Sequence, residues 1–133
     1  MKFFNTSQIR ELDQYTIEHE PISSIDLMER AARALCEKYL SAFSGQNTVC
    51  VLAGPGNNGG DALALARLLL IAGLDVKVVL LHLGKLSDDC ETNKQRLLQK
   101  FPDCFHRDVG HPRERMGAER SDDEAWVLCQ SDV

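Results

Sequence analysis

The sequence predicts an α/β fold in which helices cover a small parallel sheet. Two apolar segments, residues 47–53 and 75–83, have the composition of strands, and a helical segment follows each of them. Strand–helix units at this spacing imply right-handed crossovers and parallel strands. Two more helical segments precede the first strand, and we expect them to cover one face or edge of the sheet.

Composition narrows the class of protein. The 133 residues suffice for one domain with a core, and 44% hydrophobic and 26% charged residues are ordinary for a globular protein. The net charge of -5 argues against a nucleic-acid partner. No signal peptide is expected, and the longest apolar stretch, residues 63–74, is too short for a membrane span and contains Arg67. We expect a cytoplasmic protein with no membrane partner.

The cysteines support the same compartment. They are odd in number, far apart and without a C-x-x-C pair, which is typical of reduced cytosolic thiols rather than of disulfides or a zinc site. We expect structural roles for all of them: Cys36, Cys50, Cys90, Cys104 and Cys129.

The two leading segments are predicted helices. The first covers residues 5–20, with Asn5 and Gln8 as a capping box and Pro21 beyond its end. Its apolar residues have amphipathic spacing. The second helix covers residues 25–43. It is opened by Ser23 or Ser24, closed by Gly45, and has Met28 as a core residue.

The strand–helix part follows. The strand over 47–53 is expected to be buried on both faces because its apolar run is nearly continuous. It leads to a helix over 61–72, a second strand over 75–83 and a helix over 88–101. The predicted boundaries are Gly73 after the first of these helices, Ser87 or Asp88 as the cap of the next, and Pro102 at its end.

The last segment differs in character. Residues 106–133 show no sustained period apart from the short apolar run AWVLC, and their positive charges are all arginine. We expect this tail either to add irregular structure or not to belong to the fold of the first 105 residues.

The run GPGNNGGD, residues 54–61, lies where the first strand meets its helix. Glycines there leave backbone N–H groups free at a helix N-terminus, where the dipole favours an anion such as phosphate. The alternative is a tight turn that packs the helix on the strand. We favour the cradle, because a mere turn seldom needs four glycines and two asparagines.

Two well-known cradles fit the glycines only in part. They match G-x-G-x-x-G, but the second strand ends without the acid that would hold a ribose. They match the P-loop spacing, but Gly60 and Asp61 replace its Lys and Ser/Thr. Neither NAD-type binding nor NTP hydrolysis follows from the pattern.

The polar residues of the run have two open interpretations each. Asp61 can cap the helix, or it can bind ligand hydroxyls and accept a proton. Asn57 and Asn58 suit either a turn or a hard cation.

The run LAGPGNNGGDALALARLL resembles the signature of the NAD(P)H-hydrate epimerase family, and the earlier stretches QIRELDQYTI and LMERAARAL are also similar to it. The similarity covers approximately residues 6–101. It implies a Rossmann-like three-layer fold with a parallel sheet and two leading helices, incomplete at the C-terminus. The domain would be residues 1–105, with 106–133 as an unassigned, frame-shifted tail.

The resemblance also implies a reaction, the interconversion of the R and S hydrates of NADH and NADPH in nucleotide repair. Asn57, Asn58, Gly59, Gly60 and Asp61 would contact the hydrated dinucleotide, and Asn58 would bind a potassium ion. An ADP- or ATP-dependent dehydratase, fused in some relatives, would be the partner. Self-association into a homo-oligomer stays open.

The sequence departs from the family pattern in two places. Ala62 replaces a usual glycine, and the downstream segment with the catalytic aspartate is not found, so the catalytic residue is unknown. We expect a truncated or frame-shifted epimerase with negligible turnover on its own. The alternative is a non-catalytic nucleotide-binding or scaffold module on the same fold.

Other candidates are weaker. His82, at the end of the second strand, could face the site, but an exposed position is the simpler expectation. His106 and His111 form no metal spacing. Asp13 and Glu29 are expected on the solvated faces of the leading helices.

Overall fold

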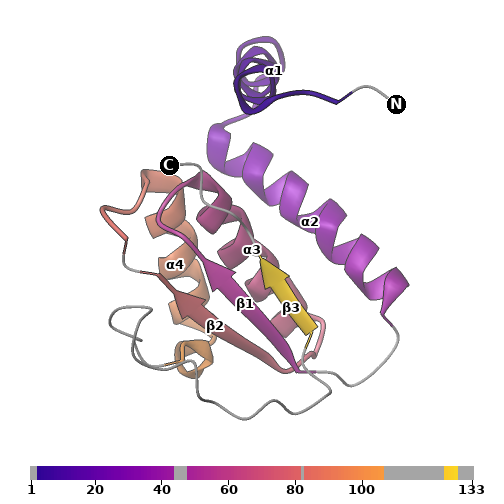
Figure 1. Cartoon of the computed structure of the whole chain (residues 1–133), viewed down its shortest axis with the longest axis vertical. Coiled ribbons are helices and arrows are strands. Elements are labelled where there is room, and N and C mark those ends of the chain that lie inside the picture. Colours follow the sequence, from indigo (N-terminus) through magenta and orange to yellow (C-terminus); the bar gives the residue numbers. More distant parts are fainter. Residues whose placement is uncertain (1–2, 44–47, 82, 107–124, 129–133) are drawn as a thin grey trace.

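A computed structural model describes residues 3–43, 48–81, 83–106 and 125–128 (Figure 1). The elements in chain order are α1 (Thr6–His19), α2 (Ser24–Ala42), β1 (Val49–Ala53), α3 (Asn57–Ile71), β2 (Val76–Leu80), α4 (Asp88–Lys100), the short 3-10 helix η1 (Pro102–Cys104) and β3 (Ala125–Leu128). The chain is therefore α/β, as predicted.

The sheet consists of three parallel strands in the order β2-β1-β3. Its central strand, β1, places Val51 between Val78 on one side and Val127 on the other. The parallel pairing of β1 with β2 confirms the predicted crossover unit. The third strand comes from the apolar AWVLC run within the predicted tail.

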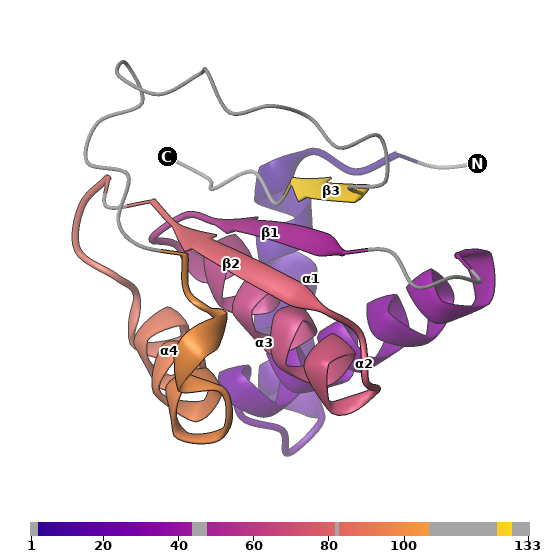
Figure 2. The ribbon, with the colours of Figure 1, turned by 90° about the horizontal axis from the view of Figure 1, so that it is seen from below.

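The helices α2, α3 and α4 lie on the same face of the sheet (Figure 2). The described residues thus form two layers, and none of the described helices covers the opposite face. The coarse α/β architecture agrees with the prediction, while a complete three-layer sheet is not seen in this part of the chain. None of the helices in the described ranges is long and apolar enough to cross a membrane.

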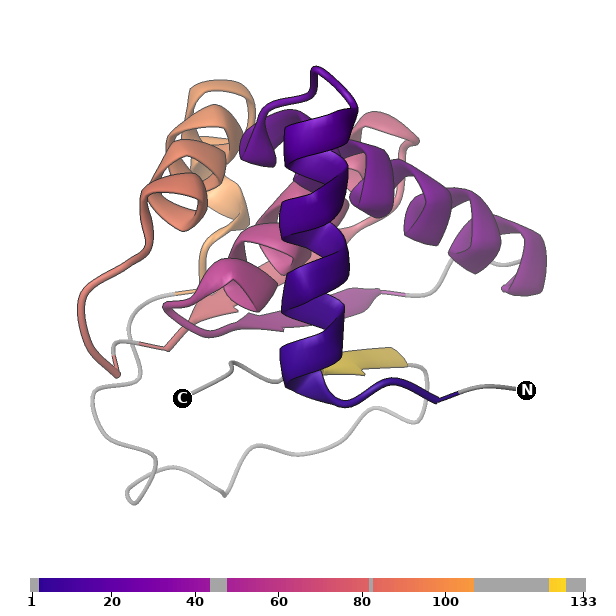
Figure 3. The ribbon, with the colours of Figure 1, turned by 90° about the horizontal axis from the view of Figure 1, so that it is seen from above.

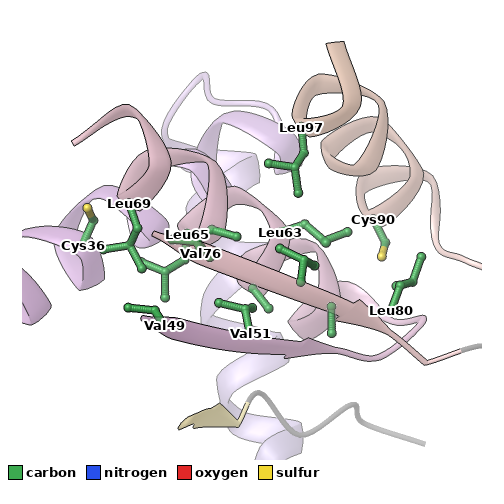
Figure 4. Close-up of a cluster of buried hydrophobic side chains, with 14 residues drawn as sticks. Cys36, Val49, Val51, Leu63, Leu65, Leu69, Val76, Leu80, Cys90 and Leu97 are labelled. Carbon is green, nitrogen blue, oxygen red and sulfur yellow. The ribbon is translucent and has the colours of Figure 1, made fainter. Parts of the chain in front are cut away.

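The core lies between the sheet and this helical layer (Figure 4). Because side chains alternate along a strand, Val49, Val51 and Ala53 all point into this core, and each is fully buried. Leu63 and Leu69 of α3 pack onto them. The interior of α3 is apolar nearly all round, as expected for the buried stretch after the glycine run.

Side-chain caps fix where the two leading helices begin. The predicted capping box of α1 is confirmed, with Asn5 and Gln8 exchanging side-chain-to-backbone hydrogen bonds of 2.9 Å in both directions. Ser23 caps α2, accepting from the Asp26 N–H at 3.2 Å. The structure thus selects Ser23 over Ser24 as the cap.

The two leading helices differ in how they pack. The helix α2 lies against α3 and buries Met28, Ala32 and Cys36. In contrast, α1 buries no residue, and its Ile9 and Leu12 are each 49% exposed. It crosses the side of the molecule toward which the strand arrows point (Figure 3). The helix α1 therefore lies at the edge of the sheet, as expected, but it buries none of its residues there.

Two predicted boundaries are wrong. The helix α3 begins at Asn57, not at Asp61, because Gly56 acts as the N-cap and the Gly60 N–H already donates to the Gly56 carbonyl at 3.1 Å. The strand β2 ends at Leu80, three residues before the predicted end. The predicted Ser87 cap of α4 is confirmed by its bond from the Cys90 N–H.

Some predicted features lie outside the described residues: Gly45, His82, His111 and Cys129.

Candidate functional site

A cavity of about 530 Å³ lies where α1 crosses the first turns of the other helices. Ligands of open parallel sheets bind at the carboxyl ends of the strands, and the start of α3 follows the carboxyl end of β1. The cavity, here called the edge cavity, is lined by Thr6, Ile9, Arg10, Asp13, Ile17, Ser24, Leu27, Met28, Ala31, Asn57, Asn58, Asp61 and Asp89.

The polar residues of the glycine run come together in this cavity. Asn57, Asn58 and Asp61 occupy the first two turns of α3 and all line it. Asp61 lies four residues after Asn57 and three after Asn58, and both spacings bring its side chain next to theirs on the helix surface. The structure thus gathers three of the five predicted substrate contacts.

The glycines of the same run serve packing. A Cβ atom on Gly59 would lie 1.8 Å from the Gly54 carbonyl oxygen, and one on Gly60 would lie 2.7 Å from the Met28 sulfur. Both glycines are buried and neither lines the edge cavity. The structure therefore supports the turn-and-packing interpretation for these two side-chain positions. A backbone contact with substrate stays a prediction.

The start of α3 has no side-chain cap. Its N-cap is Gly56, and no acidic side chain lies in its first turn. Asp61 is too far along the helix to cap it, so the capping interpretation of Asp61 is wrong. The positive end of the α3 dipole lies beside the edge cavity, which favours an anionic group there.

The Asp61 carboxyl group is electrostatically unusual. Its pKa is raised from 3.8 to about 6, chiefly by burial and further by the negative charges of Asp13 and Asp89. A carboxyl group with such a pKa exchanges protons near neutral pH. Asp61 can therefore act as a hydrogen-bond acceptor for ligand hydroxyls and can also hold a proton.

Two charged residues of the edge cavity were missed from the sequence. Asp89 lies in the first turn of α4, and its carboxylate accepts a hydrogen bond from the Ser24 hydroxyl of α2. The signal was available, since α4 follows the carboxyl end of β2, where ligands also bind. Arg10 enters from α1, and only the tertiary position of that helix reveals it.

The expectation of solvated faces fails for Glu29. Its side chain is 18% exposed and forms an ion pair with Arg67, which is 12% exposed. Asp13 does lie on an exposed helix, but it also lines the edge cavity. His106 is not part of the cavity; its backbone N–H donates to the Val78 carbonyl at 2.8 Å.

The ligands available for a metal in the edge cavity are oxygens. Asn57 and Asn58 supply carboxamide oxygens, and Asp61 supplies a carboxylate. Such donors suit hard cations. Among the described residues, no group of three or more His, Cys, Asp or Glu side chains has the arrangement of a metal site. The carboxamide and carboxylate oxygens are thus the side-chain donors that these three residues offer to a cation.

The cysteines within the described ranges are free thiols. Cys36, Cys50 and Cys90 are buried, and Cys90 donates to the Gly54 carbonyl at 3.6 Å. Burial raises the pKa of Cys36 and Cys90, so neither thiol is an activated nucleophile.

Comparison with known proteins gives consistent results. NAD(P)H-hydrate epimerase of Limosilactobacillus fermentum is 47% identical over 55% of this chain and 35% of its own length. The epimerase of Roseobacter litoralis is 32% identical over 96% of this chain and 58% of its own length. A bifunctional NAD(P)H-hydrate repair enzyme of Salinibacter ruber is 42% identical over 65% of this chain and 17% of its own length.

A solved structure and a family model match as well. The crystal structure of the yeast protein ynu0 aligns with a TM-score of 0.56 and 30% identity, covering 79% of this chain and 46% of that one. The chain thus spans less than two thirds of each of these relatives. The model of the family described as YjeF-related protein N-terminus matches residues 24–113, about two thirds of the chain. The chain belongs to this family.

Proposed function

We propose that this chain forms the substrate-binding portion of an NAD(P)H-hydrate epimerase, an isomerase that interconverts the R and S hydrates of NADH and NADPH. The relatives named above carry this activity in their names. The observation that carries the proposal is the convergence of Asn57, Asn58 and Asp61 on one cavity at the carboxyl edge of the sheet.

The edge cavity suits a dinucleotide with an anionic and a hydroxylated part. The N-terminal end of α3 and the Arg10 guanidinium favour the phosphates. Asp61 favours ligand hydroxyls and Asn58 an amide or hydroxyl contact. Gly59 and Gly60 are proposed to contact the substrate through their backbone, since neither has a side chain.

Epimerisation includes proton-transfer steps in which a carboxyl group with a raised pKa can take part. A hydrated carbon is inverted when its hydroxyl leaves as water and water returns on the other face. The first step needs a proton at the leaving oxygen and the second needs a base. Asp61, with a pKa of about 6, can supply the proton to a hydroxyl that leaves from its side of a bound hydrate.

A potassium ion is proposed at the carboxamide oxygen of Asn58. The edge cavity holds three carboxylates, Asp13, Asp61 and Asp89, against the single guanidinium of Arg10. A monovalent cation would relieve the repulsion between these carboxylates and a dinucleotide phosphate. When bound, it would supply charge neutralisation. Replacing Asn58 by Ala is expected to abolish the potassium-specific part of thermal stabilisation, measured as Tm in potassium against choline chloride.

The finer features of the family belong to the same proposal. We include a Rossmann-like sheet completed beyond the described strands, a cytoplasmic location, and an ADP- or ATP-dependent dehydratase that consumes the S hydrate. The free thiols support a reducing compartment. The bifunctional name of the Salinibacter ruber relative supports a dehydratase partner.

Calorimetric titration with hydrated NADH tests the proposal. The full chain is expected to bind the hydrate, and Asp61→Asn is expected to weaken binding at least about tenfold, because a charge-assisted hydrogen bond is lost. Asp103→Asn, a matched change at an exposed position, is expected to leave affinity unchanged. Absence of binding by the unmodified chain would overturn the proposal.

A second candidate function is a non-catalytic nucleotide-binding module on the same fold. The cavity lined by Asn57, Asn58 and Asp61 accounts for binding of a nucleotide without any chemical step, and that observation favours it. The two functions differ in turnover. Epimerisation that disappears in Asp61→Asn supports the enzyme, whereas equal binding of hydrated and intact NADH without epimerisation supports the module.

A further inference from the structure

A second cavity, of about 330 Å³, lies on the helical layer away from the edge cavity. It is lined by Glu29 of α2, Arg67 of α3, and Arg96, Gln99 and Lys100 of α4. It shares no residue with the edge cavity, although the same three helices contribute to both. Arg67 lies roughly 9 Å beyond Asp61 along the axis of α3, at 1.5 Å per residue.

The charge of this second cavity is strongly positive for a chain of net charge -5. Three cationic side chains line it against one carboxylate, that of Glu29. Glu29 is already engaged by Arg67 and by Arg33. Within the described ranges, no carboxylate lies at ion-pair distance from Arg96 or Lys100. Two positive charges of the lining are therefore uncompensated by the residues described.

One buried donor in the lining also lacks an acceptor. The Nε atom of Arg67 is buried without a hydrogen-bond partner, while its Nη2 atom binds Glu29. A buried N–H group without an acceptor costs free energy unless a ligand or water supplies one. This donor belongs to Arg67, whose side chain is one of those that line the cavity.

We propose that this second cavity binds a phosphate dianion, either free or as a phosphomonoester. Two guanidinium groups and an ammonium group supply charge, and the planar fork of Arg96 matches phosphate oxygens. A dianion balances the two uncompensated cations, whereas a carboxylate would balance one. The Gln99 carboxamide N–H adds a neutral donor. This site is independent of the dinucleotide site proposed above.

The Nε–H resonance of Arg67 provides a local test by NMR, assigned through its disappearance in Arg67→Lys. The full chain is titrated with inorganic phosphate and, separately, with glycerol phosphate, against chloride at matched ionic strength. We expect a saturable shift of this resonance with phosphate and none with chloride. A stronger affinity for the ester would identify a phosphorylated metabolite as the ligand, and equal affinities would identify free phosphate.

Matched variants separate this site from general electrostatics and from the edge cavity. The double variant Arg96→Gln/Lys100→Gln is expected to weaken the phosphate-dependent shift at least about tenfold, because two charge-assisted contacts are lost. The control Lys38→Gln/Lys85→Gln removes the same charge at exposed positions and is expected to retain it. Asp61→Asn is also expected to retain it. Absence of a saturable shift in the unmodified chain, or equal weakening in the control, would overturn the proposal.

Discussion

At the residue scale, the GPGNNGGD run divides into two sets of side-chain positions. Asn57, Asn58 and Asp61 face the edge cavity, while Gly59 and Gly60 face the interior. The division follows from the helix, which begins at Asn57 and turns successive residues to different sides. The glycines let the backbone of α3 approach the strand and α2. The polar residues are thereby held against a rigid base.

This division predicts unequal costs for two alanine substitutions. Gly59→Ala would press its Cβ against the backbone oxygen of Gly54, which cannot move away, and is expected to cost at least about 3 kcal/mol of unfolding free energy. Gly60→Ala meets the flexible end of the Met28 side chain and is expected to cost less. Urea unfolding of both variants compares them. Equal costs would contradict the packing argument.

The raised pKa of Asp61 predicts that this residue lowers the free energy of unfolding, and that it does so more at higher pH. The folded state binds the Asp61 proton more tightly than the unfolded chain does, so its contribution to unfolding free energy falls as pH rises from about 4 to about 6. Asp61→Asn is therefore expected to unfold like the unmodified chain near pH 4. Above pH 6 it is expected to be more stable, by at most about 2 kcal/mol after allowance for solvent screening.

Chemical denaturation of Asp61→Asn at several pH values between 4 and 7 measures this difference. Asp103→Asn, at an exposed site, serves as the control and is expected to show no such pH-dependent gain. A stability difference that stays constant over this range would show that the Asp61 carboxyl group titrates alike in the folded and unfolded chains.

At the element scale, the two leading helices have different sources of stability. The helix α2 is held by contacts with α3 and by the Glu29–Arg67 ion pair. The helix α1 buries no residue and depends on its own hydrogen bonds, its capping box and the ion pair of Glu20 with Arg30 that follows it. Because α1 forms one wall of the edge cavity, its local stability bears on ligand access.

Cap removal separates the two helices experimentally. Asn5→Ala and Ser23→Ala each remove one N-cap side chain, at a cost of about 1 kcal/mol to the helix concerned. In α2 this cost is expected to lower the global unfolding free energy, since α2 packs into the core. In α1 it is expected to accelerate amide hydrogen exchange within residues 6–19 and to leave global unfolding unchanged. Equal global effects would show that α1 unfolds together with the core.

At the scale of the whole molecule, the central place of β1 connects the sheet to the site. It pairs with β2 on one side and with β3 on the other, and its carboxyl end leads directly into Gly54 and the start of α3. The Gly54 carbonyl then meets both Gly59 and the Cys90 thiol. The same junction thus joins the sheet, α3 and α4 beneath the edge cavity.

Two shortened chains test whether the third strand belongs to this folded unit. A chain ending at residue 124 lacks β3, and a chain ending at residue 128 retains it. The four-residue ladder between β1 and β3 is expected to contribute about 2 kcal/mol to the unfolding free energy. The shorter chain should therefore unfold at lower urea concentration. Identical midpoints would instead favour the predicted division between residues 105 and 106.

The sequence by itself determined the order of the elements from α1 to α4, the capping box of α1 and the polar residues to consider for the site. Local chemistry suffices for these features, since capping by Asn5 or Ser87 involves only neighbours along the chain. The apolar runs were enough to predict β1 and β2, because a short, nearly continuous apolar run is typical of a buried strand. The grouping of Asp61 with Asn57 and Asn58 at one site was expected from the resemblance of the run to the family signature, and all three line the edge cavity.

Only the tertiary structure decided the start of α3, the positions of Arg10, Asp89 and Glu29, and the entry of β3 into the sheet. The physical reason is that these features depend on contacts between segments distant in sequence. From sequence alone a glycine indicates a turn, and only the position of a neighbouring backbone shows that there is no room for a Cβ atom. From sequence alone a carboxylate on a helix is expected to be solvated, and only the tertiary structure shows that another helix places an arginine or a second carboxylate beside it.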